Sequence, residues 1–193
     1  MAPRAKKTTA KKTVKSKAKK PAVKKAPAKK AAKKAAKPAA KPSVSLVGKA
    51  APAFSMPLDD GRTLSLKDLR GKPVVLYFYP KDDTPGCTVE ACDFRDRMQA
   101  FKGAVMIGVS KDPVKSHAKF KAKYSLNFPL ASDDSGVCEA YGVWKEKSMY
   151  GRKFMGVERS TFIIDKGGVV RAEWRKVSVA GHADEVKQAL RSL

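Results

Sequence analysis

The first 42 residues contain no aspartate, no glutamate and no aromatic side chain. They hold 16 lysines and one arginine, a formal charge of +17, and methionine and valine are their only larger apolar residues. Such a segment cannot bury enough apolar surface to offset the conformational entropy lost on folding. We therefore predict that residues 1–42 are a disordered basic tail and that residues 43–193 form a single folded domain.

Long apolar runs are also missing from the chain. No run is long enough to cross a bilayer, and no apolar stretch follows the N-terminal lysines as it would in a secretory signal. A transit peptide fits poorly as well, because such peptides favour arginine and serine in an amphipathic pattern. These absences predict a cytoplasmic protein that has no contact with a membrane.

Cysteine is scarce, with only Cys87, Cys92 and Cys138 in the chain. An odd number in a reducing compartment argues against a static disulfide framework. Zinc would require four ligands at a recognisable spacing, whereas Cys138, His117 and His182 form no paired motif. A C-x-x-C redox motif is absent too, so any chemistry of these thiols must rest on another arrangement.

The charge of the tail indicates an anionic partner. A flexible chain with 17 cations can displace the counterions condensed on DNA, which gives affinity without sequence specificity and a steep salt dependence. The composition is similar to the tails of linker histones and of bacterial histone-like proteins. We predict non-specific DNA binding through residues 1–42 and, with it, association with the nucleoid. An RNA, an acidic protein, a membrane surface or a purely solubilising role are the alternatives.

The order of apolar patterns in residues 43–193 predicts an α/β fold. Short runs of β-branched and aromatic residues indicate strands, and apolar residues at helical spacing indicate helices. In chain order we expect a central strand at 73–80, a helix at 88–101, a strand at 104–110, a helix at 112–126, a short helix around 138, a hairpin of 160–165 with 169–175, and a helix at 182–193. A βαβ half followed by a ββα half is the thioredoxin-like plan, a central mixed sheet flanked by helices.

Three local expectations accompany this plan. The helix at 112–126 should begin with Asp112 as its N-cap. The helix at 88–101 should pack one side through apolar residues that include Val89. The aromatic residues Trp144, Tyr150 and Phe154 are irregularly spaced, and we interpret them as packing within a loop rather than as a stacking surface.

Two cysteines share the first predicted helix. Cys87 follows Pro85 and Gly86 and so falls in the first turn, where unpaired backbone N–H groups and the helix dipole favour a thiolate. If the helix continues through Cys92, the two Cα atoms lie about 8 to 9 Å apart, whereas a disulfide spans at most about 7 Å. A bond between them would require local unwinding. Cys92 as a small core residue is the alternative, and a packed bystander role is favoured for Cys138.

Pro80, Thr84 and Cys87 occupy the spacing P-x-x-x-T-x-x-C within PKDDTPGCTVEAC, which resembles the active-site motif of peroxiredoxins. The run TPGCT-x-EAC-x-FRD is similar to the bacterioferritin-comigratory, or Q-type, subfamily. So are YGVWKEKSMYGRKFMGVERSTFIID and the final HADEV helix. The resemblance extends from about Val44 to Leu193 and leaves the tail outside.

The resemblance implies a thioredoxin-dependent thiol peroxidase that acts on hydrogen peroxide and organic hydroperoxides, without a metal or an organic cofactor. It implies that Cys87 is the peroxidatic cysteine and becomes a sulfenic acid. Cys92 would be the resolving cysteine, closing an intramolecular disulfide that a thioredoxin-like donor reduces. Many members of the subfamily are monomers, and we expect a monomer here.

The resemblance also implies roles for four further residues. Thr84 would hydrogen-bond the thiolate and the peroxide, and Arg159 would supply cationic donors to the thiolate and to the leaving oxygen. Pro80 would shield the site from water, while Glu90 would hold the arginine in place. A different class of function stays open: a DNA-coating protein in which the peroxiredoxin domain serves as a redox sensor or a passenger.

Overall fold

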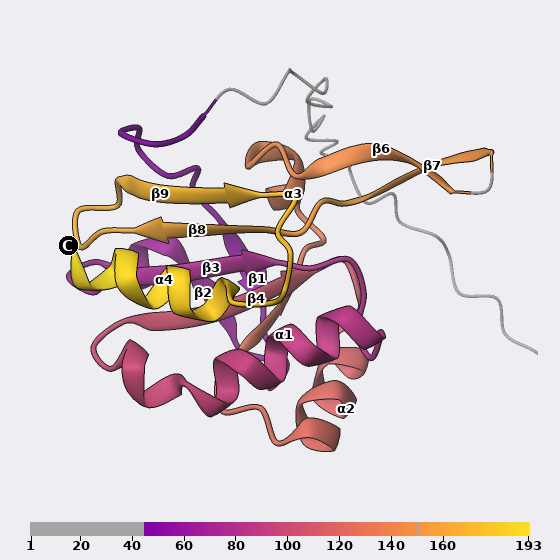
Figure 1. Cartoon of the computed structure of the whole chain (residues 1–193), viewed down its shortest axis with the longest axis horizontal. Helices are drawn as coiled ribbons and strands as arrows, with labels where there is room; N and C mark the ends of the chain where they lie inside the picture. Colours follow the sequence, from indigo (N-terminus) through magenta and orange to yellow (C-terminus); the bar gives the residue numbers. More distant parts are fainter. Residues whose placement is uncertain (1–44, 150) are drawn as a thin grey trace, which may run out of the picture. The chain divides into compact units, whose positions relative to one another are not determined.

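The computed structural model describes residues 45–149 and 151–193, so the predicted basic tail lies outside the described residues. The main feature of the described part is a five-stranded sheet with the order β5-β4-β3-β8-β9 (Figure 1). Its strands, in sheet order, are Leu130–Ser132, Val105–Ser110, Val74–Phe78, Ser160–Ile164 and Val170–Arg175. This is the mixed sheet of the predicted thioredoxin-like fold, which is thereby confirmed.

Strand β3 is the centre of the sheet, and every one of its side chains is buried. It runs parallel to β4, with Val74 opposite Val105, and antiparallel to β8, with Val74 opposite Ile164. Strands β8 and β9 form the predicted antiparallel hairpin. A strand covered on both faces needs a continuous apolar sequence, and VVLYF supplies one.

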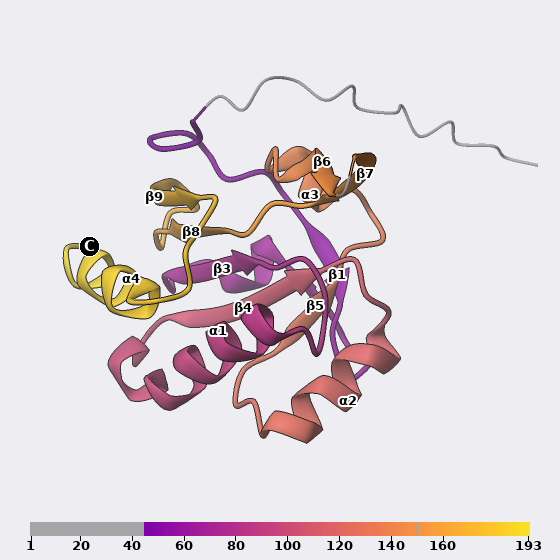
Figure 2. The ribbon, with the colours of Figure 1, turned by 45° about the vertical axis from the view of Figure 1, so that its right-hand side comes forward.

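The helices cover the two faces of the sheet unequally. One apolar cluster joins the sheet to α1 (Pro85–Asp96), α2 (Val114–Tyr124) and α4 (His182–Arg191), which Figure 2 shows on one side. The other cluster joins it to α3 (Val137–Ala140) and to the N-terminal hairpin. No helix in residues 45–149 and 151–193 has both the length and the apolar character needed to cross a membrane.

Two small hairpins and two 3-10 turns complete the described chain. Strands β1 and β2 pair with each other, as do β6 and β7, and the latter hairpin extends away from the main sheet (Figure 1). The bounds are Ser55–Pro57 for β1, Thr63–Ser65 for β2, Trp144–Met149 for β6 and Arg152–Val157 for β7, with 3-10 turns at Leu66–Leu69 and Met98–Phe101.

The predicted bounds of the first helix were wrong at both ends. Helix α1 begins at Pro85 because Thr84 already has the extended backbone of an N-cap, and it ends at Asp96, before a separate 3-10 turn. Val89 is 54 % exposed rather than part of the core. The buried face of α1 instead follows Cys87, Glu90, Ala91 and Phe94.

Two further local predictions were wrong. Asp112 is not the cap of α2, which begins after Pro113, because its carboxylate accepts hydrogen bonds from the backbone N–H of Asp82 and the hydroxyl of Ser110. The segment that contains Trp144 and Phe154 is a hairpin and not a loop, and Phe154 is 43 % exposed. Trp144 packs against the core as predicted, and Tyr150 lies outside the described residues. The charged residues of this segment stand at consecutive positions, 145–147 and 152–153, which is common to hairpins and solvated loops and does not indicate the pairing.

Candidate active site

Cys87 lies in the first turn of α1, which follows the C-terminal end of β3 at one end of the sheet. Its side chain is almost fully buried, with 2 % exposure. Pro85 favours a helix start because its missing N–H would have no partner there. The backbone N–H groups of this turn and the helix dipole give the sulfur a positive environment.

Arg159 completes that environment from the other half of the sheet. It directly precedes β8, and its Nη2 donates to Cys87 Sγ at 3.3 Å, while its Nη1 bonds the carboxylate of Glu90. A Cβ atom at Gly86 would lie 3.3 Å from Arg159 Nη2, so glycine leaves room for the guanidinium. Three of the predicted site residues, 72 positions apart at most, are thus brought together.

The buried ion pair has a particular electrostatic balance. Burial raises the pKa of Glu90 to about 7, although Arg159 acts in the opposite direction. Burial would lower the pKa of Arg159, but the charges of Glu90 and Cys87 outweigh it and raise that pKa. A permanently charged guanidinium thus lies directly beside the sulfur of Cys87.

Thr84 and Pro80 occupy the loop before the helix. Thr84 stands one turn before Cys87, but its hydroxyl donates to the carbonyl of Lys81 at 3.0 Å rather than to the sulfur. Pro80 is exposed and lines a cavity that also contains Arg159. Both residues therefore lie near the thiol, and their predicted roles stay predictions.

A buried network that sequence reasoning missed fixes this loop. The carboxylate of Asp82 accepts a hydrogen bond from the hydroxyl of Tyr79 at 2.7 Å and lies 2.9 Å from Nδ1 of the fully buried His117. Burial would raise the pKa of Asp82, but the bonds from His117, Ser116 and Tyr79 hold it below its usual value. The sequence showed His117 only as an unpaired candidate ligand, since nothing local connects it to residue 82.

The other two cysteines differ from Cys87 in position. Cys92 is half-buried in the same unbroken helix, and all three thiols are free. The predicted helical spacing is confirmed, so Cys87 and Cys92 are too far apart to bond in this conformation. Cys138 is fully buried, as expected for a packed thiol, and burial followed by the charge of Asp133 raises its pKa far above the usual range.

Comparison with known proteins gives a consistent result. The model of the AhpC/TSA family matches residues 47–173. A putative peroxiredoxin bcp of Coxiella burnetii is 57 % identical over 143 residues, which are 72 % of this chain and 95 % of the relative. Peroxiredoxin Bcp of Bacillus subtilis is 51 % identical over 150 residues, or 76 % of this chain and 96 % of that protein.

Solved structures agree with the sequence comparison. A structure of the Xanthomonas campestris bacterioferritin comigratory protein, described as a trapped intermediate/ligand complex with alkyl peroxide reduction activity, has a TM-score of 0.69 and 48 % identity. The match covers 72 % of this chain and 90 % of that one. A cysteine mutant of PrxQ from Xylella fastidiosa has the same TM-score at 42 % identity, with 72 % and 88 % covered.

Proposed function

The chain belongs to the AhpC/TSA family as a thiol peroxidase of the Bcp/PrxQ type, and from this premise we propose that Cys87 is its peroxidatic cysteine. The observation that carries the assignment is the 3.3 Å contact between Arg159 Nη2 and Cys87 Sγ at the start of a helix. Neither other cysteine has an arginine donor on its sulfur among the hydrogen bonds of the described residues.

The proposed first step is attack of the Cys87 thiolate on one oxygen of a hydroperoxide. An S–O bond forms, the O–O bond breaks, and the departing oxygen takes a proton to leave as an alcohol or as water, so that sulfur is oxidised to a sulfenic acid. Arg159 stabilises the charge that moves onto the departing oxygen. Glu90 orients Arg159, Thr84 donates to the peroxide once its hydroxyl rotates away from Lys81, and Pro80 limits access of water.

The proposed second step joins Cys92 to the oxidised Cys87. The thiolate of Cys92 attacks the sulfenic sulfur, an S–S bond forms, and the sulfenic oxygen leaves as water. Since the helix keeps the two residues about 8 to 9 Å apart, α1 must unwind between them before the bond can close. A thioredoxin-like dithiol then reduces the disulfide, itself becoming oxidised, and both thiols are restored.

The test of these roles compares Cys92→Ser with the unchanged protein. We expect Cys92→Ser to form one sulfenic acid per chain on treatment with peroxide, trapped by dimedone and detected by mass spectrometry. Turnover with thioredoxin should be lost, whereas Cys138→Ala should behave as the unchanged protein. Full thioredoxin-coupled turnover in Cys92→Ser would exclude this residue as the resolving cysteine.

We further propose that residues 1–42 bind DNA without sequence preference and hold the enzyme at the nucleoid of the cytoplasm. Support comes from the sequence, which places 17 cations and no acid in this segment. Duplex affinity should fall by several log units per log unit of salt for the full chain and be weak for a chain that begins at Ser43. Equal binding by both would remove the tail from DNA binding. Tight DNA binding with negligible peroxide turnover would favour the alternative, a DNA-coating protein with a redox-sensing domain.

A further inference from the structure

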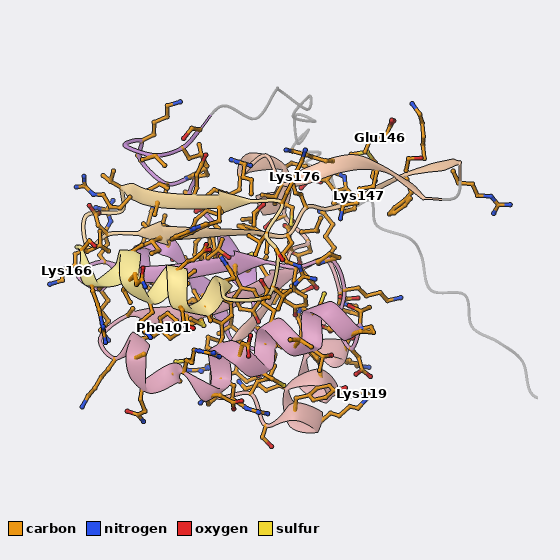
Figure 3. The ribbon with its side chains drawn as sticks, viewed as in Figure 1. Phe101, Lys119, Glu146, Lys147, Lys166 and Lys176 are labelled. Carbon is orange, nitrogen blue, oxygen red and sulfur yellow. The ribbon has the colours of Figure 1, made fainter. Side chains whose placement is uncertain are left out.

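A cavity of about 560 Å³ opens to solvent beside the proposed catalytic centre. It is formed by the first half of β6, the connection from β7 to β8 and the connection from β9 to α4, and it shares Pro80 and Arg159 with the site described above. Its other lining side chains are Lys145, Glu146, Lys147, Glu158, Lys176 and Val177. Its volume is in the range of sites that bind small molecules. Figure 3 shows Lys147 and Lys176 at the base of the β6–β7 hairpin.

The charges around this cavity do not balance. Lys145 pairs with Glu158 at 2.9 Å, and Arg159 pairs with Glu90. Glu146 pairs with a lysine outside the cavity, Lys153, at 3.0 Å. Lys147 and Lys176 are left, and within residues 45–149 and 151–193 neither has a carboxylate at ion-pair distance. Two positive charges therefore face the cavity without a carboxylate to balance them.

Lys147 is held in this position by its surroundings. Its side chain crosses the hairpin over Gly156, where a Cβ atom would lie 3.4 Å from the lysine Cδ, and its Nζ donates to the carbonyl of Val157 at 2.6 Å. Burial lowers the pKa of Lys147, and Arg159 adds to this effect while Glu158 and Cys87 oppose it. A bound anion would supply the negative charge that this ammonium group lacks.

Lys176 is held beside Arg159 by the backbone. The N–H of Val177 donates to the carbonyl of Arg159 at 3.1 Å, which joins the end of β9 to the active-site arginine. Lys176 itself has a φ of 50°, in the left-handed region that a lysine rarely adopts. Unfavourable backbone conformations of this kind are concentrated at ligand-binding and catalytic positions.

We propose that this cavity selects hydroperoxides that carry an anionic group, a carboxylate or a phosphate, and that Lys147 and Lys176 are the residues that determine this specificity. The proposal rests on the peroxidase function: the hydroperoxide end lies at Cys87 and Arg159 while the anionic group lies between the two lysines. The anionic group is unchanged by the reaction, so it contributes through binding and orientation alone.

The experiment compares two substrates that differ in charge at nearly constant shape, the para-carboxylate of cumene hydroperoxide and its methyl ester. The rate constant kcat/KM is measured for the full chain with dithiothreitol as reductant, at low and at high salt. We expect the carboxylate to be preferred at low salt and the preference to disappear at high salt. Lys147→Gln and Lys176→Gln should each lower the carboxylate-to-ester ratio by about two- to fivefold.

Lys166→Gln is the matched control, because Lys166 is an exposed lysine at the other end of β8 (Figure 3). It should leave both the ratio and the turnover of hydrogen peroxide unchanged. A ratio that stays the same in Lys147→Gln and Lys176→Gln would overturn the proposal. If these variants also showed a raised KM for thioredoxin, the lysines would be assigned to docking of the reductant. If the protein without substitutions did not turn over hydrogen peroxide, the peroxidase function itself would be refuted.

Discussion

Cys87 and Cys138 occupy similar positions in their helices but lie in opposite electrostatic environments. Each lies in the first turns of a helix, and each is buried, with exposures of 2 % and 0 %. The sulfur of Cys87 accepts a hydrogen bond from Arg159, whereas the backbone N–H of Cys138 donates to the carboxylate of Asp133 at 2.8 Å. A helix start and burial are common to both, so we attribute the proposed reactivity of Cys87 to the positive charge of Arg159 beside its sulfur, where Cys138 has the negative charge of Asp133.

The carboxylates near these two cysteines, Glu90 and Asp133, have pKa values that are shifted in opposite directions. Glu90 is bonded to one guanidinium and is otherwise poorly solvated, so burial raises its pKa to about 7. Burial would raise the pKa of Asp133 as well, but the N–H groups of Cys138 and Val137 outweigh it and hold that pKa below its usual value. Asp133 therefore occupies the start of α3, whereas the start of α1 stays available to a negative charge on Cys87.

The largest expected effect comes from exchanging the thiols themselves. Cys87→Ser should reduce peroxide consumption to the rate of the buffer, because the hydroxyl is not ionised and cannot attack the peroxide. Cys138→Ala should leave the rate unchanged. The measurement is loss of hydrogen peroxide with dithiothreitol as reductant, and a fully active Cys87→Ser would refute the comparison at once.

The next effect concerns the cation on each side. Arg159→Gln should lower kcat/KM for hydrogen peroxide by about 10²- to 10³-fold, the usual cost of one donor to a developing oxyanion. Lys111 is the corresponding cation near Cys138, with its Nζ 3.2 Å from Asp133. Lys111→Gln should leave kcat/KM unchanged, and an equal loss in both variants would indicate a general effect on folding.

A smaller effect is expected on stability at the second helix start. Asp133→Asn should lower the free energy of unfolding by about 2 kcal/mol, because an amide oxygen accepts only part of the four backbone hydrogen bonds that the carboxylate now accepts. Urea denaturation gives the value. Peroxide turnover by the folded fraction should stay the same, since this site is separate from Cys87.

The smallest expected effect is a difference in pH dependence. The pKa of Glu90 is raised on folding, so the native state holds more protons and stability should fall as the pH rises from about 4.5 through about 7. The pKa of Asp133 is lowered, so its contribution should be lost only as the pH falls below about 3.8. Between pH 5 and pH 8 we therefore expect the free energy of unfolding to decrease. Glu90→Gln should flatten the curve, and an unchanged slope would contradict the assignment.

Much of this comparison could be predicted from the sequence, because local patterns determine it. Pro85, Gly86 and Cys87 directly after an apolar strand indicated a thiol at a helix start, and the family motif supplied Arg159, 72 positions away. The contact of Asp82 with His117 could not be predicted, since it joins a loop to a helix whose periodicity shows only burial.

The errors in the helix assignments have the same origin. A valine at helical spacing reads as a core residue, yet Val89 faces solvent because the buried face is turned toward Glu90 and Cys87, which the pairing with Arg159 fixes. The β6–β7 hairpin was missed because its residues pair mainly with each other and pack little apolar surface. Tertiary contacts decided both cases, and a single sequence does not show them.

Hydrogen bonds hold helix α1 at both ends, and the stability of this helix affects the proposed reaction. Asp82 holds the loop before it, while Nη1 of Arg95 donates to the carbonyl of Tyr124 at 2.6 Å and holds its end. In the proposed cycle the sulfenic acid on Cys87 persists until the helical turns between these two contacts unwind and Cys92 can reach it. A second peroxide can reach it during that interval and carry the sulfur on to the irreversible sulfinic acid. The unwinding rate of this one short helix would thereby determine the peroxide concentration at which the enzyme is inactivated by overoxidation.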